Sequence, residues 1–257
     1  MHIVTLSFDD GFLKSNARIA AIYEKHGLSA CFNVIATGHL DSFLPPNRWH
    51  AGFPTGSFET WNELQARGHE IMPHGLRHAN KAALPLAEAQ QLILECLTVF
   101  GRQLAGFDPK EAVFNFPYNA STPELEAWLP SVVKAFRTRG DGINPLPHSG
   151  QVKLTTSAEG PGNCEKHLDA MIARLLALPS GWLIYNTHGL DEEGWGPIGS
   201  DYLDRLLARL VAIPTLRILP AGQALKSVTP DPALAGARFL GDPCAPLSPT
   251  DWPESQR

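Results

Sequence analysis

Short apolar runs alternate with segments of helical period along most of the chain. Runs such as "HIVTLSF" and "GWLIYNT" have the character of buried strands, whereas "LAEAQQLILECLTVFGRQL" repeats its apolar positions every three or four residues, as an amphipathic helix does. The pattern predicts strands at residues 2–8, 29–37, 69–75, 112–118, 132–138, 181–189 and 216–220, and helices at residues 13–26, 60–68, 86–104, 121–129, 163–178 and 200–213. Strands that alternate with helices indicate an α/β fold with a largely parallel sheet, and about seven such units predict a distorted or incomplete β/α barrel.

The pattern also indicates how the chain is divided. We expect one domain over residues 1–226 and a proline-rich extension over residues 227–257 that packs on its surface. Residues 39–58 have no regular period and contain prolines, glycines and aromatic residues, which predicts a long loop across one face. Within this loop, His39, Trp49 and His50 either line the entrance to a site or are ordinary surface residues.

Composition and charge exclude several classes of protein. Hydrophobic residues make up 44% and charged residues 18% of the 257 positions, as in an ordinary globular protein. The formal net charge of -5 gives no electrostatic reason to expect a nucleic acid or an anionic membrane as partner. No apolar run approaches the roughly 18 residues of a membrane-spanning helix. The first residues, "MHIVTLSFDD", lack the basic start and apolar core of a secretory signal, so we expect a cytoplasmic protein.

Polar residues gather where the predicted strands end. In α/β folds the carboxyl ends of the strands meet on one face, where the reactive groups lie. The residues that we expect on this rim are Asp9, Asp10, His74, His78, Tyr118 and His188.

The rim residues include a potential metal site. His74 and His78 are four positions apart in "HGLRH", so on a helical turn both imidazoles leave the same face. With an aspartate from another strand they form a two-histidine, one-carboxylate set that leaves coordination positions open. The adjacent Asp9 and Asp10 repel each other less if one binds a cation while the other acts as a base. Alternatively, "DDG" forms a turn that caps the helix at residue 13.

Four segments resemble the motifs of the polysaccharide deacetylases, carbohydrate esterase family 4 with the NodB homology fold. They are "SFDDG", "HGLRH" after "GHEI", "FNFPYN" and "LIYNTHG", in the family's order over about residues 1 to 225. The resemblance implies that Asp10, His74 and His78 bind the metal. It further implies that Asp9 is the general base and His188 the general acid. The resemblance favours Zn²⁺ as the metal, with Co, Ni, Mn or Fe as alternatives.

The same resemblance implies roles near the substrate for two further residues. The main-chain amide of Tyr118 would help to hold the oxyanion. Asn115 occupies the position of the family's arginine, which orients the base, so we expect Asp9 to be less firmly held and its pKa to be less depressed.

Two further assignments leave alternatives open. Asp141 in "RGDGINP" is the candidate for the aspartate that tunes His188, or else a turn residue. Trp195 either forms a wall of a sugar pocket or packs within its loop.

The resemblance implies a metal-dependent hydrolase that removes an acetyl group from an N-acetylated sugar or polysaccharide through a metal-bound water. One alternative is hydrolysis of a small non-sugar or cyclic amide on the same fold, because fold does not determine substrate. Another is a non-catalytic carbohydrate-binding descendant. The expected partner is an N-acetylated sugar or another small amide, and the sequence contains no indication of the oligomeric state.

Overall fold

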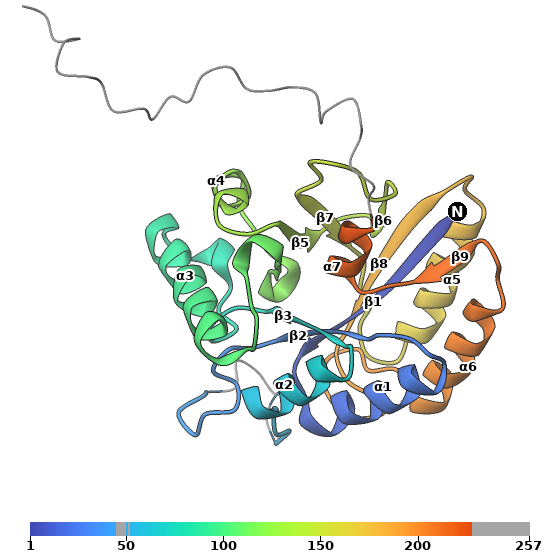
Figure 1. The fold of residues 1–257 in the computed structure, drawn as a ribbon, viewed down its shortest axis with the longest axis horizontal. Coiled ribbons are helices and arrows are strands. Elements are labelled where there is room, and N and C mark those ends of the chain that lie inside the picture. Colours follow the sequence, from blue (N-terminus) through green and yellow to red (C-terminus); the bar gives the residue numbers. More distant parts are fainter. Residues whose placement is uncertain (45–49, 51, 228–257) are drawn as a thin grey trace, which may run out of the picture.

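The computed structural model describes residues 1–44, 50 and 52–227, which form an α/β fold with two sheets flanked by helices (Figure 1). The strands are β1 (His2–Asp10), β2 (Cys31–Val34), β3 (Glu70–Pro73), β4 (Val113–Asn115), β5 (Ala135–Arg139), β6 (Ile143–Asn144), β7 (Lys153–Thr156), β8 (Gly181–Thr187) and β9 (Leu216–Ile218). The α-helices are α1 (Leu13–Lys25), α2 (Phe58–Ala66), α3 (Leu86–Gln103), α4 (Pro123–Trp128), α5 (Cys164–Leu176), α6 (Ser200–Val211) and α7 (Ala221–Lys226). Among the short 3-10 turns, η3 (Pro117–Asn119) follows β4 directly.

The strands are divided between two sheets, so the barrel is not closed. The larger sheet has the order β3-β2-β1-β8-β6, with β9 also paired to β1, and the smaller has the order β4-β5-β7. The strand pairs are parallel except for the antiparallel pair of β6 and β8. An isolated parallel bridge between Ser157 and Tyr185 connects the end of β7 with β8. The predicted distorted, incomplete β/α barrel is confirmed.

Strand β1 lies at the centre of the larger sheet and is buried over its whole length. It pairs with β8 on one edge, and on the other edge with β9 near its start and with β2 near its end. Because side chains alternate along a strand, Val4, Leu6 and Phe8 join the large apolar cluster, while Ser7 and Asp9 face the opposite way. The alternation therefore carries Asp9 into the interior of the barrel.

An apolar layer fills one part of this interior. It contains one or two residues from each of six strands: Ile3, Cys31, Val113, Ala135, Leu154, Trp182 and Ile184. Helix α7 contributes Ala221, Ala224 and Leu225 to the same cluster. Nearer the carboxyl ends of the strands, the register pairs Asp9 with Asn33 and Asn115 with Arg137, so a polar layer follows the apolar one.

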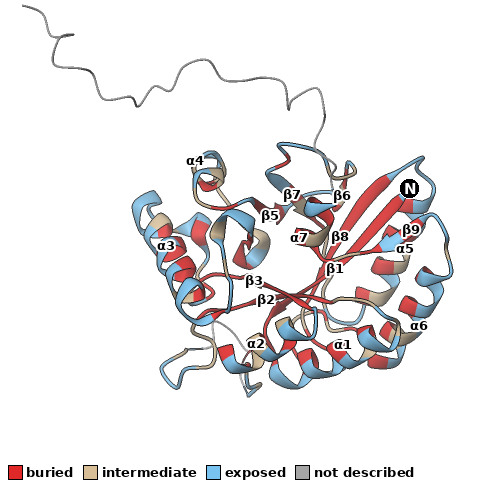
Figure 2. Cartoon of the chain, viewed as in Figure 1, coloured by how far each residue is buried: buried red, intermediate tan, exposed pale blue. Residues whose placement is uncertain are grey.

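The helices cover the outer faces of the strands. In Figure 1, α2, α1 and α6 lie in a row along one side of the strands, and Figure 2 shows buried residues on their inner faces and exposed residues outside. The spacing of the apolar residues explains this arrangement, because the buried leucines of α6, at positions 203, 206, 207 and 210, fall on one helical face. No described helix is both long enough and apolar enough to cross a membrane.

A carboxylate from a distant loop secures the start of α1. The residue before this helix, Phe12, has no side chain that can cap it, and Glu193 instead accepts hydrogen bonds from the amide and the hydroxyl of Ser15. The side chain of Glu193 is buried, although its acidic neighbours Asp191 and Glu192 are exposed. This contact joins the segment after β1 to the segment after β8, and both carry residues of the rim.

The sequence pattern missed three elements. Strands β6 and β7 have two and four residues with the sequences "IN" and "KLTT", which are too short and polar to stand out. Helix α7 has six residues and was also not predicted. Within the predicted long loop, Trp49 lies outside the described residues, as does the predicted extension from position 228 onward.

Candidate active site

The site begins with the two aspartates at the end of β1. Both side chains are buried, at 2% exposure for Asp9 and 1% for Asp10. Asp10 has a φ of 76°, a left-handed conformation that is unfavourable for a residue with a side chain. The strand therefore turns at Asp10, and the two adjacent carboxylates make different contacts.

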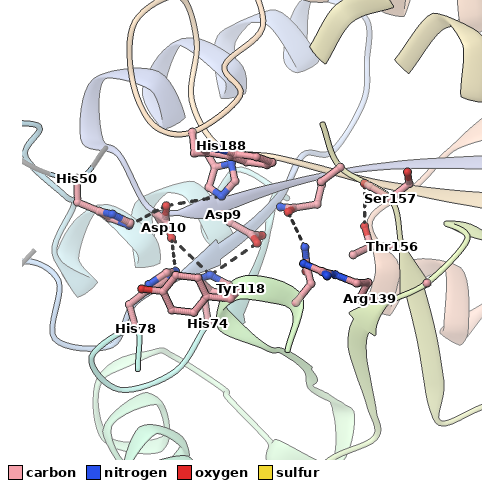
Figure 3. A pocket seen from close by; sticks show the side chains of 15 residues that line it. Asp9, Asp10, His50, His74, His78, Tyr118, Arg139, Thr156, Ser157 and His188 are labelled. Atoms are coloured by element: carbon pink, nitrogen blue, oxygen red, sulfur yellow. Dashed lines mark hydrogen bonds and ion pairs between the residues drawn. The ribbon is translucent and has the colours of Figure 1, made fainter. Parts of the chain in front are cut away.

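Histidines surround the carboxylate of Asp10 (Figure 3). Its Oδ1 lies 3.4 Å from His74 Nε2 and 3.3 Å from His78 Nε2. Its Oδ2 lies 2.8 Å from His50 Nε2 and 3.9 Å from His188 Nε2. The sequence predicted that His74, His78 and His188 share a rim with Asp10, and the structure brings all of them together.

The donor set around Asp10 fits a cation. Asp10 Oδ1 is buried and accepts no hydrogen bond from the described residues, which is costly for a carboxylate oxygen unless a cation satisfies it. His74 Nδ1 donates to the carbonyl oxygen of Asn115 at 3.0 Å, and this contact leaves the Nε2 lone pair directed toward the carboxylates. Burial lowers the pKa of His78 to about 3, so its imidazole is neutral and can also offer a lone pair.

His50 belongs to this cluster, although the sequence left its role open. Asp10, His50 and His78 each offer a ligand atom, and these atoms lie within 4.8 Å of one another. This group shares Asp10 and His78 with the predicted set, and His50 adds a third imidazole beside His74, whose Nε2 lies 3.4 Å from Asp10 Oδ1. The sequence held no signal for this contact, since His50 lies in the long loop 24 positions before His74.

Asp9 is held by a network of donors in the polar layer. Arg137 forms a two-pronged ion pair with it, in which Nη1 donates to Oδ1 at 2.9 Å and Nη2 donates to Oδ2. Asn33 Nδ2 donates to Oδ1 at 2.7 Å. Both donors also contact the hydroxyl of Ser7, at 2.6 Å each. Oδ2 remains on the side of the histidines, 3.6 Å from His74 Nε2.

The electrostatic surroundings keep both carboxylates ionised. Burial alone would raise the pKa of Asp9, but the charge and hydrogen bonds of Arg137, together with His74, lower it below its usual value. Burial would also raise the pKa of Asp10, but the nearby His78 and His188 and the hydrogen bond from His50 hold it well below its usual range. Asp9 can therefore accept a proton at neutral pH.

His188 follows the end of β8 and faces the same cavity. Its side chain is 12% exposed, and burial lowers its pKa despite the opposing effect of Asp10 and Asp9. The ring of Trp195 meets the ring of His188 edge to face, with centroids 5.8 Å apart. The sequence left open whether Trp195 lines a pocket, and the structure places it in the cavity lining.

Strained backbone conformations concentrate around this site. Five described residues other than glycine have positive φ, and four of them, Asp10, His78, Tyr118 and Asn119, line the cavity. The ring of Tyr118 packs against the ring of His78 with centroids 4.7 Å apart. Such strain persists only where the surrounding structure enforces it, and it is typical of functional sites.

The site opens into a cavity of about 560 Å³. This volume is within the range of about 300 to 1,000 Å³ that is typical of small-molecule sites. Its described lining residues are Asp9, Asp10, His50, His74, His78, Tyr118, Asn119, Arg139, Gly140, Thr156, Ser157, Ala158, Asn186, His188 and Trp195.

Comparisons with known proteins agree with this geometry. A sequence profile of the family described as polysaccharide deacetylase matches residues 1–129, half of the chain. The chain belongs to the polysaccharide deacetylase family. This is the family whose motifs the sequence resembles. No curated protein matches the chain significantly.

Solved structures of the deacetylase fold resemble this protein over most of its length. The Bc1960 peptidoglycan N-acetylglucosamine deacetylase is 16% identical, with 88% of this chain and 92% of that chain covered and a TM-score of 0.58. A protein from Mycobacterium smegmatis, assigned to the polysaccharide deacetylases, is 14% identical over 88% and 89% of the chains, with a TM-score of 0.65. A family pseudoenzyme from Bacillus anthracis is 11% identical over 88% and 66%, with a TM-score of 0.56. These likenesses show that the fold is that of the deacetylases.

In this polysaccharide deacetylase family member, the expectation for Asn115 needs correction. Asn115 does not line the cavity, and its Nδ2 donates at 2.7 Å to Oδ1 of Asn33, which in turn donates to Asp9. The arginine that the third motif lacks is supplied by Arg137 of the neighbouring strand β5. Asp9 is thus firmly held and its pKa is lowered, contrary to the expectation. The sequence contained no specific signal for Arg137, because the predicted strand at residues 132–138 also contains the polar residues Lys134 and Thr138.

The structure does not bring Asp141 to His188. Asp141 is an exposed residue that forms a two-pronged ion pair with Arg174, in which Nη1 lies 2.6 Å from Oδ1. It is absent from the described lining of the cavity. The alternative reading of Asp141 as a residue of a turn agrees with its position between β5 and β6.

Proposed function

We propose that this protein is a metal-dependent deacetylase that hydrolyses the acetamide of an N-acetylated amino sugar or a related small amide. One observation carries the proposal. The buried Asp10 Oδ1, which accepts no hydrogen bond from the described residues, faces the imidazole nitrogens of His74 and His78 beside an ionised Asp9. Carboxylate and imidazole groups are the ligands that Zn²⁺ and other transition metals take in hydrolases.

The residues that would hold the metal are Asp10 and His78 with His74, His50 or both. A divalent cation bound there supplies Lewis acidity, which lowers the pKa of a water and polarises an acyl oxygen. The orientation of His74 is fixed from behind by the carbonyl oxygen of Asn115, which favours binding through Nε2.

Asp9 acts as the general base in this proposal. Arg137 donates to both oxygens of its carboxylate and Asn33 to Oδ1, which keeps it ionised, and Oδ2 also borders the histidine cluster. A positioned carboxylate can take the proton of an attacking water, a contribution worth about a hundred- to ten-thousandfold in rate.

His188 acts as the general acid. Its Nε2 lies 3.9 Å from Oδ2 of Asp10, whereas the other two motif histidines lie nearest to Oδ1. It lines the same cavity and can pass a proton to the departing amine. Because burial lowers the pKa of His188, its protonated form relies on the neighbouring carboxylates, which favour the charged imidazolium. We further propose that the amide of Tyr118 stabilises the oxyanion and that Trp195 packs against the substrate.

Acetate release tests the proposal directly. We would assay a panel of N-acetylated sugars and small cyclic and linear amides, with protein saturated with Zn²⁺ or Co²⁺ and with protein stripped by a chelator. We expect release from at least one acetylated sugar, lost on chelation and restored by metal. Release from a non-sugar amide alone would support the alternative substrate class. Bound metal and bound sugar without any release would support a non-catalytic descendant, and one of the similar structures is a pseudoenzyme of the family from Bacillus anthracis.

A further inference from the structure

The far side of the cavity carries a positive charge that the proposed mechanism does not use. Figure 3 shows Arg139, Thr156 and Ser157 across the cavity from Asp10 and His50. Arg139 is the single lysine or arginine among the described residues that line the cavity. It forms no ion pair with any described residue, whereas Arg137 is bound to Asp9.

The geometry of β5 explains how the two arginines divide their roles. Arg137 and Arg139 are two positions apart, so their side chains leave the same face of the strand. Arg139 lies about 7 Å farther toward the carboxyl end, where the strand leaves the buried interior. The burial pattern of β5 agrees, because its first four residues are buried and Arg139 is exposed. One strand therefore presents one guanidinium to the base and a second to the cavity.

A second observation is an unmet hydrogen-bonding group in the same cavity. Asn119 lines the cavity, and its Oδ1 is buried without a hydrogen-bond donor among the described residues. Its Nδ2 is already engaged, because it donates to Asn186 Oδ1 at 3.1 Å. A hydroxyl or N–H group of a ligand would satisfy Asn119 Oδ1.

The charge balance of the cavity favours an anion. Asp9 is paired with Arg137, and a divalent cation would more than offset Asp10, which leaves the charge of Arg139 in excess. The chain as a whole has a formal net charge of -5, so this local charge is not a consequence of a basic protein. A guanidinium recognises carboxylate and phosphate oxygens through two parallel hydrogen bonds.

We infer that Arg139 forms an anion subsite, and that the substrate is an N-acyl compound with a carboxylate or phosphate group distal to the amide. This inference rests on the proposed function, because it places the acyl group beside Asp10 and the anion at Arg139. Asn119 then accepts a hydrogen bond from the part of the substrate between them.

Ligands without an acetyl group test the subsite independently of catalysis. We would measure the dissociation constants of glucosamine, glucosamine 6-phosphate and muramic acid by calorimetry on the full chain as purified. We expect at least one anionic sugar to bind about tenfold to a hundredfold more tightly than glucosamine, as a charged hydrogen-bonded contact predicts. The phosphate and carboxylate ligands distinguish the two anions. Equal affinity for all three sugars, or no binding of any, would overturn the inference.

Substitutions of Arg139 distinguish an effect of its charge on ligand binding from an effect on the structure of the protein. Arg139→Gln should remove the preference for the anionic sugar, and Arg139→Lys should retain part of it, because lysine keeps the charge but not the planar fork. Arg205→Gln is the matched control, since Arg205 is exposed on α6 and forms no ion pair with a described residue. It should keep the full preference. A preference that persists in Arg139→Gln would contradict the assignment of the subsite to this residue.

Acetate release from the corresponding N-acetyl sugars tests the proposed deacetylase activity separately from the anion subsite at Arg139. A preference that depends on Arg139, together with no release from any sugar, would refute the deacetylase but leave the anion subsite standing. Release with the same kcat/KM for N-acetylglucosamine and its anionic derivatives would refute the subsite and leave the deacetylase standing.

Discussion

Arg137 and Asp9 are 128 positions apart in the chain and form a buried two-pronged ion pair at the base of the active site. Both side chains are 2% exposed, so water does not screen the contact. The pair replaces the contact that the third motif of the polysaccharide deacetylases would make from position 115. The orienting charge is therefore kept although the residue that carries it lies on a neighbouring strand.

Removal of this guanidinium should harm both stability and activity. Arg137→Gln leaves Asp9 as a buried charge without its main partner, and we expect a loss of about 3 to 5 kcal/mol in the free energy of unfolding. The pKa of Asp9 should rise, so the acidic limb of the pH profile of kcat/KM should move to higher pH. Chemical denaturation and steady-state kinetics measure the two effects. The double variant Asp9→Asn/Arg137→Gln should be more stable than Arg137→Gln, and if it is not, the two residues are not coupled.

Replacement of Asp9, the proposed base, should reduce turnover but leave metal binding intact. Asp9→Asn removes the carboxylate that we propose as the proton acceptor, so kcat should fall by about a hundredfold to ten-thousandfold. Metal content, measured by elemental analysis, should remain near that of the unmodified protein because Asp10 and the histidines are intact. Asp201→Asn, an exposed position in the first turn of α6, is the control and should retain activity. Full turnover in Asp9→Asn would exclude Asp9 as the base.

Metal affinity should reveal which histidines are ligands. Because His50 Nε2 lies 2.8 Å from Asp10 Oδ2 in the tight group with His78, we expect His50→Gln to weaken metal binding. His78→Gln should weaken it further, since His78 belongs to both the predicted set and the observed group. Competition with a chelating dye gives the affinities, and the visible absorption of bound Co²⁺ reports on the ligand set.

The exposed His148 provides the control for that series. His148→Gln should leave both the metal affinity and the Co²⁺ spectrum unchanged. A His50→Gln protein with the affinity and spectrum of the His148→Gln protein would show that the metal is bound without His50.

Acid should destabilise the metal-free protein. Burial lowers the pKa of His78 to about 3 and lowers that of His188, whereas both are near 6.5 in the unfolded chain. Below pH 6.5 the unfolded state therefore binds more protons than the folded state. The contribution of these histidines to the free energy of unfolding is fully present above this pH and is lost as the pH falls. In this pH range, each such histidine lowers the free energy of unfolding by up to about 1.4 kcal/mol for each unit that the pH falls.

Thermal unfolding in the presence of a chelator between pH 8 and pH 5 measures this dependence. His78→Gln should show a shallower loss of Tm than the unmodified protein, because one of the buried neutral imidazoles is gone. His148→Gln should show the original slope, since its side chain is exposed in the folded protein. Identical slopes in His78→Gln and the unmodified protein would mean that His78 does not carry this pH dependence.

The sequence by itself determined the architecture and several of the residues that gather at the candidate site. Alternating apolar and polar positions are a local property, so they revealed the strand and helix order and the partial barrel. The first two motifs also revealed Asp9, Asp10, His74 and His78, because their spacing reflects the shared rim at the ends of β1 and β3.

Only the tertiary structure decided which distant side chains complete the site. Arg137, Asn33 and His50 lie in segments with no local signal of function, and their contacts with the aspartates arise from the register of separate strands and the path of a long loop. Asp141 failed as a prediction for the same reason, because a turn sequence does not indicate which face of the molecule it occupies. Periodicity is encoded in neighbouring residues, whereas contacts between remote residues depend on how the whole chain packs.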